Sequence, residues 1–285
     1  MTLHRETMEA YLAREAVSAS FCHDLTSECP RYAYLRSPFC PEEERVAHSA
    51  TDAMDFGTIA HCALLEEHLL EERILLVSEA NWRTKSAQAM REQAAGEGKI
   101  AMLTRDYQRV RELRWSLESD PVAGPLVFSK GESELSYTWE WDGVPCKARI
   151  DRLTECEEGK CLVHLKTSRS ANPLAFANVG AGLGYALAMA WYLDGWYEQS
   201  PEAAFDSYRM VVIGSNPPHL TTVCYYDPID LEIGRRRYKK ALVEFRRARE
   251  SGVWRGYAVG NGPVMLREPA WYRRAVSDEE GMDHG

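Results

Sequence analysis

An aspartate, a histidine and a lysine stand close together near the centre of the chain. Asp151 closes one stretch of alternating residues, and His164 and Lys166 belong to the next stretch. We expect a turn centred on Glu157-Glu158 to join the two stretches as antiparallel strands. In that register Asp151 lies opposite His164, and Lys166 shares their face because side chains alternate with a period of two. A shift of one residue would separate them.

These residue types could cleave a phosphodiester bond. Hydrolysis needs a divalent metal, held by carboxylates, that polarises the phosphate and generates hydroxide. It also needs a cation that stabilises developing charge and orients the water. Asp151 supplies one carboxylate and Lys166 supplies the cation, but the position two residues before the lysine holds His164 in place of a second acid.

Strands must position this cluster, and the surrounding sequence has strand periodicity. Between residues 133 and 141, apolar side chains alternate with polar ones such as Glu134. Asp142-Gly143 follows and is typical of a hairpin turn. We expect strands at 133–141, 144–153, 161–167, 205–213 and 220–226, with a short one at 74–77.

Helical spacing flanks the strands. Apolar residues recur near helical spacing between residues 103 and 117, with arginines between them, and serine at position 18 suits a helix cap. We expect helices at 18–25, 55–70, 85–97, 104–118, 173–197 and 229–251. The pattern predicts an α/β fold with a central mixed sheet flanked by helices.

Domain organisation follows from the same pattern. We expect one domain over 1–276, with a mainly helical part at 1–120 and the sheet core at 121–276, followed by an acidic tail at 277–285. The net charge of −9 argues against a protein that coats DNA nonspecifically, but it leaves room for a local basic channel. No signal peptide and no apolar run of about 18 residues is present, so we expect a cytoplasmic protein with no membrane contact.

Short motifs between residues 56 and 238 give a specific resemblance. Their order and spacing resemble the RecE-like (exodeoxyribonuclease VIII) family of PD-(D/E)xK nucleases. The motifs are Phe56-Gly57-Thr58-Ile59-Ala60-His61, Thr84-Lys85, Cys146-Lys147-Ala148-Arg149-Ile150-Asp151, Leu165-Lys166-Thr167, Tyr185, Trp191-Tyr192-Leu193-Asp194-Gly195, Asn216-Pro217-Pro218 and Gly234-Arg235-Arg236-Arg237-Tyr238.

The resemblance implies a restriction-endonuclease-like core and a set of site residues. His61 looks like the family's metal-site histidine, Asp151 like the central metal ligand and Lys166 like the catalytic lysine. Glu134 matches an acidic residue on the preceding strand. Tyr185 stands where the family has a tyrosine on the helix beside the site.

Three positions depart from the family pattern. His164 replaces the acid, Ala188 replaces a glutamine and Gly214 replaces a glutamate before the Pro-Pro turn. Two interpretations of His164 stay open. It could join His61 and Asp151 as a metal ligand, which favours Mn²⁺ over Mg²⁺. Alternatively, the lost carboxylate marks a site that no longer binds a hard metal.

A basic helix is the main candidate for contact with DNA. A charge run is usually only a solvated helix face, but on an acidic chain it could bind phosphates. The candidate DNA-binding residues are Arg235, Arg236, Arg237, Lys239, Lys240, Lys85 and Tyr185.

The leading hypothesis is a metal-dependent exonuclease that uses Mg²⁺ or Mn²⁺ and acts on double-stranded DNA ends. The resemblance further implies 5′→3′ polarity, a homo-oligomer and work beside a single-strand annealing protein in phage-type recombination. One alternative is a pseudo-nuclease that binds DNA or protein without cutting. Another is a regulatory protein that binds a second nuclease or a defence complex through its acidic surface.

Overall fold

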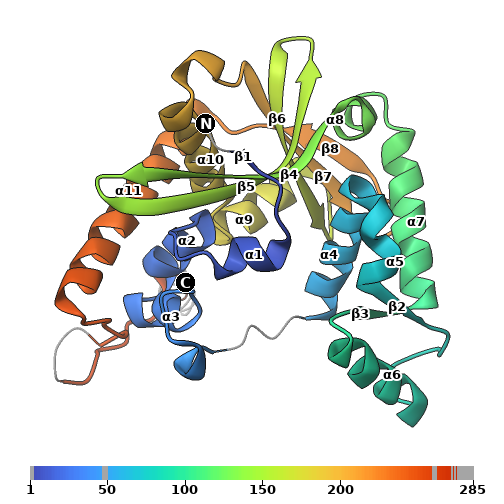
Figure 1. The fold of residues 1–285 in the computed structure, drawn as a ribbon, viewed down its shortest axis with the longest axis horizontal. Coiled ribbons are helices and arrows are strands. Elements are labelled where there is room, and N and C mark those ends of the chain that lie inside the picture. Colours follow the sequence, from blue (N-terminus) through green and yellow to red (C-terminus); the bar gives the residue numbers. More distant parts are fainter. Residues whose placement is uncertain (1–2, 47–50, 259–261, 271, 273, 275–285) are drawn as a thin grey trace, which may run out of the picture.

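A mixed sheet of six strands forms the centre of the molecule (Figure 1). The computed structural model describes residues 3–46, 51–258, 262–270, 272 and 274. The strands lie in the order β1-β4-β5-β6-β7-β8, and only the β6–β7 pair is parallel. Their bounds are β1 Leu3–His4, β4 Gly131–Trp141, β5 Val144–Cys156, β6 Gly159–Ser168, β7 Ser207–Gly214 and β8 Thr221–Cys224.

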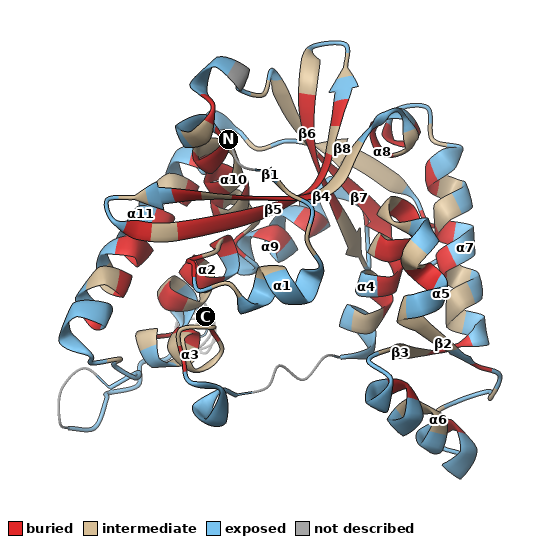
Figure 2. Cartoon of the chain, in the orientation of Figure 1, coloured by how far each residue is buried: buried red, intermediate tan, exposed pale blue. Residues whose placement is uncertain are grey.

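Helices cover both faces of this sheet and create two hydrophobic cores. One core, with Tyr137 and Trp191 fully buried, lies between the sheet and three helices: α2 (Ala19–Ser27), α10 (Tyr185–Gln199) and α11 (Pro228–Ser251). The other contains Ile59 and Leu165 and is covered by α4 (Asp52–Leu65), α7 (Thr104–Glu118) and α8 (Ala123–Phe128). Figure 2 shows the buried residues on the sheet and on the inner faces of the helices. The predicted α/β fold is confirmed.

The central hairpins have the predicted registers. Asp142 and Gly143 have φ of 46° and 78°, which fits a two-residue hairpin turn between β4 and β5. Between β5 and β6 the pairing runs from Cys156 opposite Gly159 to Arg152 opposite Val163. The turn therefore lies at residues 157–158, as expected.

A smaller parallel sheet lies beside the main one. Strand β2 (Ile74–Val77) pairs with β3 (Ile100–Leu103), and α6 (Lys85–Gly96) connects them. Thr84 begins this helix, because its hydroxyl accepts a hydrogen bond from the backbone N–H of Ala87 at 3.1 Å.

The expected single helix over 173–197 is wrong. The structure has α9 (Pro173–Gly182) and α10, which meet at an angle of 75°. Gly184 caps α10 with φ of 69°, a left-handed conformation that stops α9 from continuing. Among the described residues no single helix is long and apolar enough to cross a membrane. The bent α9–α10 pair passes that test only by length and composition.

Several short elements were missed. They are β1, β3, α8, α1 (Met8–Ala13), α3 (Pro30–Leu35), α5 (Leu70–Arg73) and three 3-10 helices at Glu42–Glu44, Glu67–Leu69 and Pro201–Ala203. Each has six residues or fewer, which is too short for periodicity to appear. The expected acidic tail at 277–285 lies outside the described residues.

Candidate metal centre

Strand β5 changes its alternation at Asp151. Ile150 and Leu153 both contact the first core although they are three positions apart, so these side chains do not follow the strict alternation of a regular strand. The pairing with β4 keeps one register on both sides of Asp151 but omits Asp151 itself, and the pairing with β6 ends at Arg152. Opposite it on β4, Glu134 has φ of 56°, which is uncommon for a residue with a side chain. The sheet is thus irregular where the two carboxylates lie.

Helix α4 brings His61 to these carboxylates. Ile59 and Ala60 are fully buried on the second core, which fixes the rotation of the helix. A Cβ on Gly57 would lie only 3.2 Å from the Thr167 hydroxyl, so the glycine lets α4 approach β6 closely. Within the described part of the chain, ligand atoms of three side chains lie within 4.8 Å of one another: His61, Glu134 and Asp151.

Asp151 has contacts on both sides. Its Oδ2 accepts a hydrogen bond from the backbone N–H of Leu165 at 2.8 Å, and the Lys166 Nζ lies 3.9 Å from the same oxygen. Burial on its own raises the pKa of this carboxyl, but the neighbouring His164 and Lys166 outweigh burial and hold the pKa well below its usual range. Asp151 is therefore ionised at neutral pH and can bind a cation.

The other two members of the group differ in protonation. Burial, assisted by the positive charge of Lys166, lowers the pKa of His61 to about 4, which keeps its imidazole neutral. Burial and the charge of Asp151 raise the pKa of Glu134 to about 7, against the opposing effect of Arg149. Near neutral pH the Glu134 carboxyl is partly protonated, and a metal ion that binds this carboxylate displaces the proton.

His164 lies beside the group rather than within it. Its Nδ1 is 2.6 Å from Asp151 Oδ2, but the ring nitrogen has no aligned hydrogen bond within the described structure. The ring packs edge-on against Tyr192, with 5.2 Å between the ring centroids. Burial lowers the pKa of His164, so a neutral imidazole stands against the aspartate.

Lys166 and Tyr185 meet at the edge of this site. The Lys166 Nζ lies 5.5 Å from the centroid of the Tyr185 ring. Tyr185 is the first residue of α10, directly after the bend at Gly184. The bend that the sequence failed to show thus places the predicted site tyrosine beside the predicted catalytic lysine.

The donor set of His61, Glu134 and Asp151 fits a divalent metal ion. One neutral imidazole and two carboxylates offer one nitrogen and up to four oxygens, which suits Mn²⁺ and also permits Mg²⁺. The three side chains converge from α4, β4 and β5, and two of them have pKa values displaced by burial.

Arg149 supports Glu134, a role that the sequence did not indicate. Its Nε donates to Glu134 Oε2 at 2.5 Å, and its Nη1 donates to the backbone oxygen of Glu6 at 2.8 Å and to the Ser136 hydroxyl at 3.3 Å. Arg149 thus connects the N-terminal segment to the metal centre.

Most of the predicted DNA-binding cations lie on α11, which packs against α10. Arg235 forms a double hydrogen bond with Asp194, Arg236 pairs with Glu232 at 3.1 Å, and Arg237 contacts Thr26. Lys239 lies over the ring of Trp141. Lys240 and Lys85 are exposed, the latter at the start of α6. Among these candidate DNA-binding residues, Arg235 is the one whose guanidinium is held by a double hydrogen bond to a carboxylate of the protein.

Two of the departures can be placed in the structure. Gly214 ends β7 with ordinary backbone geometry, and a Cβ there would meet its nearest atom at 3.5 Å. No steric demand therefore explains the glycine. Ala188 is half-buried on α10 and packs against the first core.

Comparison with known proteins agrees with this geometry. A family described as "PDDEXK-like domain of unknown function (DUF3799)" matches residues 27–259. The chain belongs to this family. The match includes the metal centre, the six-stranded sheet except β1, and the helices of both layers except α1 and most of α2.

One solved structure shows the same fold. A "putative exonuclease" from Eubacterium rectale superposes with a TM-score of 0.63 at 13% identity, covering 95% of this chain and 98% of that one. A protein named SSO0001 aligns over 85% of this chain and 88% of its own, at 12% identity, but its TM-score of 0.34 carries no argument. No curated protein matches the sequence.

Proposed function

We propose that this protein is a metal-dependent exodeoxyribonuclease that degrades duplex DNA from its ends. The observation that carries the proposal is the convergence of His61, Glu134 and Asp151 within 4.8 Å, with Lys166 at 3.9 Å from Asp151. Carboxylates that hold a metal, with a lysine beside them, are the parts that phosphodiester hydrolysis needs.

Each side chain has a distinct part in this proposal. His61, Glu134 and Asp151 hold Mn²⁺ or Mg²⁺, which when bound polarises the scissile phosphate and activates water. Lys166 directs its ammonium group at the oxygen that gains charge. Arg149 orients Glu134 through their hydrogen bond. Tyr185 keeps the lysine in place through its ring.

The setting of this activity is also proposed. On the resemblance of its motifs, the enzyme acts 5′→3′ in the cytoplasm as a homo-oligomer, and it supplies single strands to an annealing protein during phage-type recombination. The exposed Lys240 and Lys85 are available for phosphate contact.

A DNA degradation assay tests the activity. Linear duplex DNA is incubated with the protein and Mg²⁺ or Mn²⁺, beside a covalently closed circle of the same sequence. We expect degradation of the linear form only, abolished by chelation and reduced at least about 100-fold by Lys166→Ala. Lys130→Ala, at an exposed lysine, is the matched control and should keep full activity. Degradation that survives Lys166→Ala would refute the assignment.

One observation favours a second function, that of a pseudo-nuclease that binds without cutting. Oδ2 of Asp151 already contacts the Leu165 N–H and the His164 ring, which leaves one free oxygen for a metal. In the same assay this function predicts retarded DNA on a gel, without metal and without degradation. Lys166→Ala would then leave binding unchanged.

A further inference from the structure

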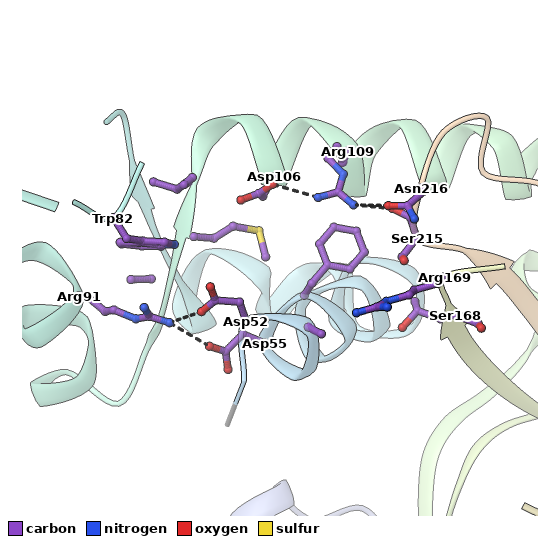
Figure 3. Close-up of a pocket in the computed structure, with 16 residues that line it drawn as sticks. Asp52, Asp55, Trp82, Arg91, Asp106, Arg109, Ser168, Arg169, Ser215 and Asn216 are labelled. Atoms are coloured by element: carbon purple, nitrogen blue, oxygen red, sulfur yellow. Dashed lines mark hydrogen bonds and ion pairs between the residues drawn. The ribbon is translucent and has the colours of Figure 1, made fainter. Parts of the chain in front are cut away.

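A pocket of about 340 Å³ opens at the carboxyl ends of β6 and β7, the parallel pair of the main sheet (Figure 3). Thr167 and Ser168 line it from the end of β6 and Arg169 from just beyond it, and Ser215 and Asn216 line it from the segment that follows β7. In open α/β sheets, ligands bind in the crevice at the carboxyl ends of the strands. No member of the metal centre lines this pocket.

Two of the arginines around the pocket are already paired. Arg91 pairs with Asp52 at 2.5 Å, and Arg109 pairs with Asp106 at 3.1 Å. Arg109 also donates to the backbone oxygen of Ser215 at 2.7 Å. These contacts build the walls of the pocket and pair two of its three aspartates, and the third, Asp55, lies 3.9 Å from Arg91.

Arg169 differs from the other two. It is exposed, and within the described residues it has no hydrogen bond or ion pair. Figure 3 shows its side chain extending from the end of β6 into the pocket, with Ser168 and Ser215 beside it. A free guanidinium with hydroxyl groups nearby is well suited to bind a phosphate through two hydrogen bonds.

The rest of the lining suits a flat ring. The rings of Trp82 and Phe56 form part of the walls, and the aliphatic side chains of Met102 and Leu103 form the surface between them. A binding pocket that is mainly apolar, with a few directed polar groups, holds a small ligand by burial and orients it by hydrogen bonds. A nucleotide has a matching arrangement, because its flat base can pack against the apolar walls and its charged phosphate can bind the arginine.

We propose that this pocket binds one unpaired nucleotide of a DNA strand, with its phosphate on Arg169 and its base against the Trp82 side. The proposal rests on the proposed nuclease function and adds how the strand is held next to the cut. Arg169 follows Lys166 by three residues, so their Cα atoms are at most about 11 Å apart. A strand gripped at Arg169 therefore reaches the metal centre within a few nucleotides.

Binding of a mononucleotide tests the pocket without any nuclease activity. Deoxyadenosine monophosphate is titrated into the full chain by calorimetry in the presence of a chelator, with deoxyadenosine and inorganic phosphate as separate ligands. We expect the nucleotide to bind at least tenfold more tightly than either fragment. Arg169→Ala should weaken nucleotide binding at least tenfold, because it removes a charged phosphate contact.

Arg111→Ala is the matched control, since Arg111 is an exposed arginine of α7 outside the pocket. It should bind the nucleotide like the unaltered protein, and thermal melting of both variants should be unchanged. Three results would overturn the proposal: no nucleotide binding, equal binding by Arg169→Ala, or phosphate alone binding as tightly as the nucleotide. A protein that binds the nucleotide but fails to degrade DNA would keep the pocket and reject the nuclease.

Discussion

At the scale of residues, the metal centre depends on charges that burial has displaced. Asp151 keeps its charge because His164 and Lys166 lie beside it, whereas burial and the charge of Asp151 outweigh Arg149 at Glu134 and raise its pKa to about 7. His164 occupies the position of an acid and presents a neutral ring to Asp151. Metal affinity is therefore set by the state of Glu134 and by the identity of residue 164.

Metal affinity should change with pH through Glu134. Its raised pKa means that the metal-free folded protein binds a proton below about pH 7, and that proton competes with the metal. We expect Mn²⁺ affinity to fall up to about tenfold for each pH unit below 7 and to level off above it. Calorimetric titrations between pH 6 and 8 measure this slope. Glu134→Gln should bind more weakly and lose the slope; an unchanged slope would exclude Glu134 as the titrating ligand.

The change His164→Asp should improve binding of Mg²⁺. A second carboxylate beside Asp151 supplies the hard oxygen ligand that Mg²⁺ prefers over imidazole. We expect at least about tenfold tighter Mg²⁺ binding, with a smaller change for Mn²⁺. His164→Asn is the control, because it has the size of aspartate without the charge. If both variants bind Mg²⁺ with equal affinity, the missing carboxylate at position 164 does not limit the Mg²⁺ affinity of the site.

At the scale of elements, the site depends on how α4, α10 and three strands meet. The sequence predicted β4, β5 and β6 and their registers, because polar and apolar residues alternate in β4 and β5 and the turns at Asp142-Gly143 and Glu157-Glu158 fix the pairing. It did not predict the bend between α9 and α10, because the segment is mostly apolar across the bend and the left-handed backbone of Gly184 leaves no sign in that pattern. The hydrogen bonds of Arg149 to Glu134 and to the backbone of Glu6 connect β5 with β4 and with the N-terminal segment. Contacts between residues so far apart produce no pattern in the local sequence.

Gly184→Ala should destabilise the fold more than Gly182→Ala. Gly184 has φ of 69°, and an added Cβ would lie 2.6 Å from His23 Nδ1, whereas a Cβ at Gly182 meets nothing within 4 Å. Strain at a left-handed position costs about 1 to 3 kcal/mol, while the alanine at Gly182 should be neutral or slightly stabilising. Chemical denaturation of both variants gives the comparison. Equal unfolding midpoints would mean that the bend tolerates a side chain.

At the scale of the whole molecule, two hydrophobic cores on opposite faces of one sheet hold the metal centre between them. The sequence predicted this layered arrangement because helical and strand periods alternate along the chain. It could place His61 at the site only through the resemblance of its motif, since α4 and β5 are about 90 residues apart and their contact is set by tertiary packing.

Metal binding should stabilise the whole chain. A ligand that binds only the folded state adds about 2.7 kcal/mol when its concentration is 100 times its dissociation constant. We expect Mn²⁺ to raise the melting temperature and a chelator to reverse the rise. Asp151→Asn, which removes the central ligand charge, should show no rise. A rise of equal size in that variant would place the stabilising metal elsewhere.

Glu134 and Asp151 lie opposite each other in the β4–β5 hairpin, and this pairing limits where related proteins can gain residues in the hairpin. A single residue gained within either strand, between the turn and its carboxylate, would rotate that carboxylate to the other face of the sheet. Residues gained in the Asp142-Gly143 turn leave the opposition intact. Natural insertions in this hairpin should therefore accumulate at its tip.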